Sequence, residues 1–261
     1  MKLAICIGAL GLLAGLSWPT QTKKAQDSAD AAPVNLERMP ESLEVRFALS
    51  AAPPHLRDGA TTYVLDPAKG YILSHQGTNG ISCIVVRSDW QWPDLPFRDD
   101  VFWAVCYDAE GSKTLMQDYV YAAQLRAQGM DVRQVHQGVT KRFGMPAHGN
   151  PARTGVAYMI APVMRTLIGG PHPTIPATMN MPHYMFYAPG VTNADIGGKP
   201  ISHYPFILSM SLGRDDVIIL LVGEAEKDKI LSEFKDLLGE LCSYKDYLCT
   251  TAETRAQMPY N

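Results

Sequence analysis

The chain has 261 residues, a net charge of −3 and 46% hydrophobic residues. This composition fits an ordinary globular protein and excludes an intrinsically disordered one. The excess of acidic over basic residues argues against nucleic acid as a partner, because an acidic surface repels phosphate backbones.

The first 25 residues have the pattern of a secretory signal peptide. Lys2 precedes an apolar run from Leu3 to Leu16, and polar residues follow. This run is shorter than the ~20 apolar residues that span a bilayer. We therefore expect a cleaved signal over residues 1–25, with an uncleaved anchor as the alternative. The cleavage removes three lysines and no acid, which takes the net charge from −3 to −6.

The next segment, residues 26–40, is rich in Ala, Asp, Ser and Pro and predicts a flexible leader. The remainder predicts one domain over residues 41–249 and a tail over 250–261. Leu43–Ala51 has some strand-like alternation, but its stop at two prolines favours a short helix. Turn residues then separate three strands, which predict an antiparallel meander over Thr61–Leu65, Tyr71–His75 and Ile81–Arg87.

The second half of the chain alternates helices and strands. A fourth strand is expected over Val101–Tyr107. Apolar residues with a 3.6-residue period then predict a helical pair over 113–128 and 131–143, with Ser112 and Asp131 as N-caps and Gly129 as C-cap. Further strands are expected over Gly155–Pro162 and Tyr184–Ala188, and a hairpin over Phe206–Leu212 and Val217–Val222, followed by a helix over 225–241. Because it is apolar on both faces, Val217–Val222 is expected to be a central, covered strand.

These elements predict an α+β fold. We expect a mainly antiparallel sheet, with the helical pair and the C-terminal helix packed on one side.

Four cysteines remain after export, and an even number in an exported chain predicts disulfides. We expect the pairs Cys83–Cys106 and Cys242–Cys249, although three pairings are possible and free buried thiols are the alternative. The second pair is seven residues apart, which is ~10.5 Å of rise on a continuous helix. A disulfide needs Cα atoms within roughly 7 Å, so the helix has to end near Cys242.

No sequence motif of a hydrolase, zinc protease, nucleotide-binding protein or calcium-binding protein is present. No cofactor is therefore expected. The candidate site residues come instead from two polar segments. In the first, His55, Arg57 and Asp58 follow two prolines in a turn, where they offer a titratable base, a fixed cation and a carboxylate. The alternative is that they cap neighbouring backbone groups.

The second polar segment follows a predicted strand. His183 and Tyr187 lie on that strand, and Asn193 and Asp195 lie in the turn after it. Polar groups at strand ends commonly equip a binding pocket. Here the alternative is that the aromatic residues belong to the core and that Asp195 forms an Asx-turn.

Methionine and histidine alternate over Met179–Met185, and soft thioether and imidazole ligands select Cu(I). In an extended chain, however, these side chains follow one line and span ~20 Å, at ~3.3 Å per residue. Pro182 also stiffens the segment. We therefore predict no dedicated metal site, and keep copper handling as an alternative in which His172 adds a ligand.

Four blocks of the chain resemble those of uncharacterised exported bacterial proteins. They are Ser50–His55 (SAAPPH), Gly77–Gly80 (GTNG), Cys106–Gly111 (CYDAEG) and Tyr187–Gly197 (YAPGVTNADIG). They span most of the mature chain, so the resemblance implies one domain. It implies no activity.

These observations favour a secreted or periplasmic protein that binds a small polar ligand in a pocket lined by His55, Arg57, His183, Tyr187 and Asp195. No membrane span is expected after signal removal. A hydrolase or lyase that uses a His–carboxylate pair is the rival hypothesis. A third is an interaction protein with an exposed Trp90–Phe97 loop.

Overall fold

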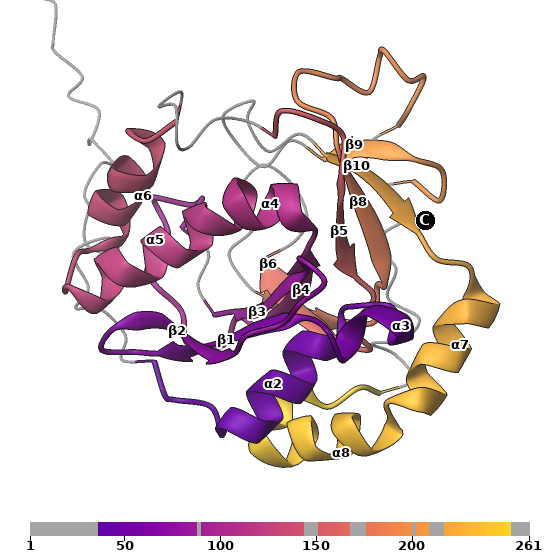
Figure 1. Ribbon diagram of the computed structural model, residues 1–261, viewed down its shortest axis with the longest axis horizontal. Helices are drawn as coiled ribbons and strands as arrows, with labels where there is room; N and C mark the ends of the chain where they lie inside the picture. Colours follow the sequence, from indigo (N-terminus) through magenta and orange to yellow (C-terminus); the bar gives the residue numbers. More distant parts are fainter. Residues whose placement is uncertain are drawn as a thin grey trace, which may run out of the picture.

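The computed structural model describes residues 36–87, 90–143, 151–167, 176–199, 202–208 and 217–251. The predicted signal peptide, leader residues 26–35, His172 and tail residues 252–261 lie outside these ranges. Within them the predicted α+β class is confirmed: helices flank a large, mainly antiparallel sheet (Figure 1). No helix among the described residues is long and apolar enough to cross a membrane.

The first half of the sheet has the strand order β2-β1-β3-β4. The strands are β1 (Thr61–Asp66), β2 (Gly70–His75), β3 (Ser82–Val86) and β4 (Trp103–Tyr107). The predicted meander is wrong, because β1 lies between β2 and β3 and runs parallel to β3. The connection after β2 therefore crosses the start of β1. There, a Cβ on Gly77 would lie 2.2 Å from Gly59 O, so this crossing leaves no room for a side chain.

The second half of the sheet has the order β5-β8-β10-β9. Its strands are β5 (Val156–Met159), β8 (His183–Tyr187), β10 (Val217–Leu221) and β9 (Phe206–Leu208). The strand β10 is next to the edge strand rather than central, and its Leu220 is 37% exposed. The hairpin of β6 (Met164–Leu167) and β7 (Pro176–Met179) forms a second sheet that was not predicted.

One face of the large sheet is covered by the helical pair. Its members are α5 (Leu115–Ala127) and α6 (Val132–Thr140), preceded by α4 (Ala109–Lys113). Asp131 caps α6 in a reciprocal hydrogen-bonded box with Gln134, as predicted. The predicted cap Ser112 is wrong: α5 begins after Thr114, which makes no capping hydrogen bond, and Ser112 lies in α4, which Asp108 caps. Trp90 is fully buried in this core and packs edge-on against Tyr119. Phe97 is buried too, which removes two of the exposed anchors that the interaction hypothesis requires.

The other face is covered by helices from both ends of the chain (Figure 1). They are α2 (Glu41–Ser50), α3 (Pro54–Arg57), α7 (Glu224–Glu233), α8 (Lys235–Tyr244) and the short 3-10 helix η2 (Asp246–Leu248). The single predicted C-terminal helix is two helices that meet at Phe234. The helical pair and the C-terminal helices therefore cover opposite faces of the sheet, rather than packing together on one side.

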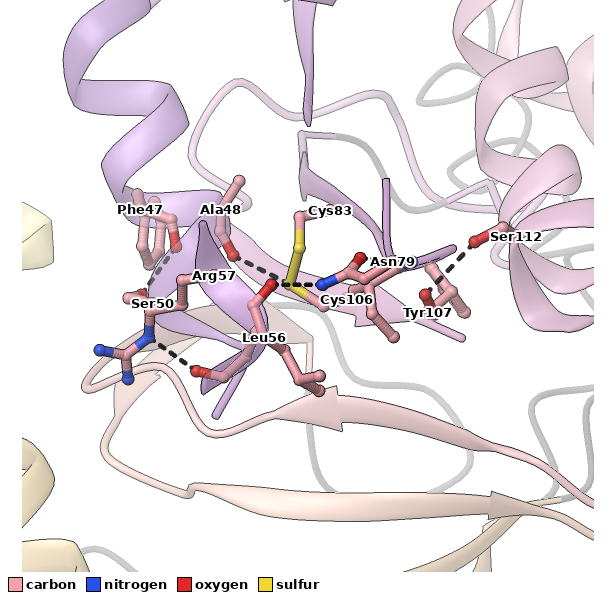
Figure 2. The surroundings of a disulfide bond; sticks show 12 residues. Phe47, Ala48, Ser50, Leu56, Arg57, Asn79, Cys83, Cys106, Tyr107 and Ser112 are labelled. Atoms are coloured by element: carbon pink, nitrogen blue, oxygen red, sulfur yellow. Dashed lines mark hydrogen bonds between the residues drawn. A yellow bond between two sulfur atoms is a disulfide. The ribbon is translucent and has the colours of Figure 1, made fainter. Parts of the chain in front are cut away.

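Both predicted disulfides are confirmed. Cys83 and Cys106 are directly opposite each other on β3 and β4, with Cα atoms 4.0 Å apart. Figure 2 shows this bond under α2, where Cys106 Sγ lies 3.3 Å from Ala48 O. Cys242 and Cys249 have Cα atoms 4.3 Å apart. The helix α8 ends between them, as that pairing requires.

Candidate functional site

The first candidate group lies at α3, on the sheet face that α2 and α8 cover. Arg57 donates from Nε to Ala52 O at 2.8 Å (Figure 2), and its guanidinium forms an ion pair with Glu233. The same guanidinium stacks over the ring of Phe234, 4.7 Å from the centroid. Arg57 therefore fastens α3 to the junction of α7 and α8, while His55 and Asp58 are exposed.

Tyr187, at the end of β8, belongs to a hydrogen-bonded junction centred on Asp108. The tyrosine hydroxyl donates to Asp108 Oδ1 at 3.2 Å. Oδ1 also accepts from the backbone N–H groups of Glu110 and Gly111, and Oδ2 accepts from Val156 N at 3.0 Å. These contacts join α4, β5 and β8. Burial, then the charge of Asp108, raises the pKa of Tyr187 above its ordinary value, so the hydroxyl stays neutral.

Asn193 and Asp195 lie in the turn between β8 and β9, and both bind nearby groups. Asp195 Oδ2 accepts from Thr192 N and from the Thr192 hydroxyl, at 2.8 and 2.7 Å. These hydrogen bonds lower the pKa of the exposed Asp195 carboxyl. Asn193 exchanges two hydrogen bonds with the backbone of Ile207, which fastens the turn to β9. The contacts of both residues stabilise the turn.

Among the candidate residues, His183 has a buried ring in which one nitrogen is bonded by no described residue. It lies on β8, 3% exposed, and its Nδ1 is 2.7 Å from Met181 O. A carbonyl oxygen only accepts, so Nδ1 carries the proton and Nε2 presents its lone pair. Within the described residues Nε2 has no hydrogen-bond partner. Burial lowers the pKa of His183 to about 4, so the ring is neutral near pH 7.

These placements separate the predicted site residues. The α3 group lies on one face of the sheet, and His183 and Tyr187 point to the face that α5 and α6 cover. Among the described residues no contact joins the two groups. An open groove of about 630 Å³ lies between α2 and α8, lined by Pro40, Ser42, Leu43, Lys235, Asp236, Gly239, Glu240 and Ser243. None of the predicted site residues lines it.

The residues that a catalytic or hard-metal site needs are also dispersed. In the described part of the chain, neither His55 nor His183 has a carboxylate within hydrogen-bond reach. Nor do these ranges contain three or more His, Cys, Asp or Glu side chains placed to hold a metal ion.

Sequence reasoning missed a buried acid on the inner face of α2. Glu44 is fully buried, and its Oε1 accepts from Leu65 N at 2.8 Å. Burial raises the pKa of this carboxyl to about 7, against the opposing effects of that hydrogen bond and of Arg87. Arg87 is itself 1% exposed and stacks over Phe102, 3.7 Å from the ring centroid. The sequence places Glu44 among Leu43, Val45 and Phe47, and a helical reading of that pattern is the signal that could have found it.

Asp108 was missed as well, although it directly follows a predicted strand and aspartate is a preferred N-cap residue. Searches for relatives found nothing: no protein-family model, no curated protein and no solved structure matches the chain. The candidate site is therefore defined by geometry alone, and its centre is His183.

Proposed function

We propose that this chain is an exported binding protein whose ligand contacts His183. The single observation that carries the proposal is the state of this side chain: buried, neutral and fixed through Nδ1, with Nε2 free. Such a ring binds a partner that accepts an electron pair. The ligand is therefore a hydrogen-bond donor or a metal ion.

The same features favour binding over catalysis. A general base works best when its pKa lies near the working pH. The pKa of His183 is about 4, well below neutrality, and a carbonyl rather than a carboxylate orients the ring. The hydrolase or lyase hypothesis therefore ranks second.

Export is part of the proposal. Structural disulfides form and persist in oxidising compartments, and the fold holds two of them. Together with the signal-like segment at residues 1–25, they point to a secreted or periplasmic location. The resemblance to exported bacterial proteins points the same way.

A thermal-shift screen tests the binding site. The probes are small polar compounds and metal ions, added to the wild-type protein and to the variants His183→Leu and His55→Ala. We expect the stabilising probe to lose its effect in His183→Leu and keep it in His55→Ala. Equal stabilisation of all three proteins would place the site elsewhere. Loss in both variants would show that the effect is not specific to His183 and would also contradict the proposal.

A further inference from the structure

Methionines surround His183 from more than one strand. The register of β5 and β8 places Met159 directly opposite His183, and Met159 is 7% exposed. Side chains opposite each other in an antiparallel pair have Cβ atoms about 5 Å apart. A thioether on Met159 and the imidazole of His183 can therefore meet at one point between the two strands, which lie side by side in Figure 1.

A second thioether comes from β8 itself. Met185 is two residues beyond His183, so it lies on the same face about 6.6 Å along the strand. It packs against the same core cluster that contains Met159. Its partner on β5 is Ala157, whose small side chain is fully buried. Because Ala157 carries only a methyl group, it does not obstruct a Met185 side chain that turns toward the Met159–His183 pair.

The imidazole is held as metal-binding histidines usually are. Such a histidine commonly donates its second N–H to a carbonyl or carboxylate, which fixes the ring and leaves the other nitrogen as the ligand. Here Nδ1 donates to Met181 O at 2.7 Å.

The donor atoms select the kind of ion. The proposed site offers one imidazole and two thioethers, and within the described residues no carboxylate bonds the ring. Hard cations such as Ca²⁺ and Mg²⁺ need oxygen ligands, and structural zinc sites use thiolates, imidazoles or carboxylates. Soft neutral sulfur and imidazole donors favour Cu(I). Burial of the ring also favours an ion of one atom over a larger molecule.

The sequence argument against a metal site was that ligands on a single strand follow a line. The structure changes that argument, because Met159 approaches from the neighbouring strand and converts the line into a triangle. We propose that His183 Nε2, Met159 Sδ and Met185 Sδ form a three-coordinate site for Cu(I). This inference rests on the proposed function, since it names the ligand of the same histidine.

Competition for Cu(I) tests the site. The purified protein, with both disulfides formed and without thiol reductants, is titrated anaerobically with Cu(I) against a chromogenic chelator. We expect one tightly bound Cu(I) per chain. Met159→Leu and Met185→Leu should each weaken binding by more than about 100-fold, because loss of an outer contact alone costs about 10- to 100-fold. Met39→Leu is the matched control, because this buried methionine lies on the opposite sheet face. Leucine and methionine have similar volumes, and circular dichroism checks that each variant folds.

Several results would overturn the assignment. One is a wild-type protein that does not compete for Cu(I), and another is unchanged affinity in both Met159→Leu and Met185→Leu. X-ray absorption of the copper complex should show one nitrogen and two sulfur scatterers, so a purely nitrogen and oxygen environment would also contradict it. If Cu(I) does not bind but another probe still stabilises the protein only when His183 is present, the copper assignment is wrong and the proposed binding centre at His183 stands. If no probe requires His183, the proposed function itself fails.

Discussion

Replacing Glu44 with glutamine should change how the free energy of unfolding depends on pH. The folded protein raises the pKa of this carboxyl from 4.5 to about 7, mainly through burial, while Arg87 and Arg38 oppose the rise and Glu41 adds to it. Between these values the folded state keeps a proton that the unfolded state has lost. The contribution of Glu44 to stability is therefore complete below pH 4.5 and is lost as the pH rises through about 7.

The magnitude follows from the two pKa values. At about 1.4 kcal/mol per pH unit, the gap between 4.5 and about 7 corresponds to about 3 kcal/mol. His183 acts in the opposite direction, because burial lowers its pKa from 6.5 to about 4. Its contribution is complete above pH 6.5 and is lost as the pH falls through about 4, again about 3 kcal/mol. Over much of this range the pH dependence from Glu44 and that from His183 cancel, so the stability of the wild-type protein changes little with pH.

The test is to measure the free energy of unfolding at intervals from pH 4.5 to 7, by urea denaturation followed through tryptophan fluorescence. Relative to wild type, Glu44→Gln should gain about 3 kcal/mol across that range. Glutamine keeps the acceptor for Leu65 N, so that hydrogen bond is retained. Glu226→Gln, an exposed carboxyl on α7 that is not among the groups acting on Glu44, is the control and should leave the pH profile unchanged. A Glu44→Gln profile parallel to that of wild type would refute the reasoning.

Three further predictions concern the fold. Asp108→Ala should lower the free energy of unfolding by about 3 kcal/mol or more, because it leaves several donors unpaired, whereas Tyr187→Phe should lower it by about 1 kcal/mol. Equal losses for the two variants in urea denaturation would contradict the central role of the Asp108 carboxylate. Gly77→Ala should destabilise the protein, since the added Cβ would lie 2.2 Å from a backbone atom, while Gly239→Ala in α8, where the added Cβ meets open space, should stabilise it by up to about 1 kcal/mol. An unchanged stability of Gly77→Ala would contradict the tight crossing of the chain over the start of β1. Non-reducing peptide mapping should find Cys83–Cys106 and Cys242–Cys249, and four alkylatable thiols would contradict both the pairing and the export proposal.

Local signals predicted most of the individual elements. The capping residue Asp131 and the apolar period marked α6, and the spacing of Cys242 and Cys249 required the end of α8 where it occurs. The pairing of strands that are distant in the sequence was harder to predict. The parallel alignment of β1 with β3 leaves no local pattern, because it depends on a connection that crosses the start of β1. The short strands β6 and β7 carry too few residues for a clear period.

The candidate site was harder to predict for the same reason. Arg57 and Tyr187 looked available in the sequence because their partners, Glu233 and Asp108, are 176 and 79 residues away. Asp195 bonds Thr192 within its own turn, and Asn193 bonds the backbone of Ile207 on β9, so neither side chain is held toward a distant site. The sequence did show the Met/His alternation, which contributes two of the three proposed ligands. The third proposed ligand, Met159, became visible only through the register of β5 and β8.

The central claim is that His183 is a neutral imidazole with an open Nε2, and long-range proton–nitrogen NMR of the histidine rings tests it directly. At pH 7 the His183 ring should show a protonated Nδ1 and an unprotonated Nε2, and anaerobic Cu(I) should shift the Nε2 resonance of this ring in particular. A ring protonated on Nε2, or an Nε2 resonance that Cu(I) leaves unchanged while shifting another histidine, would contradict the account.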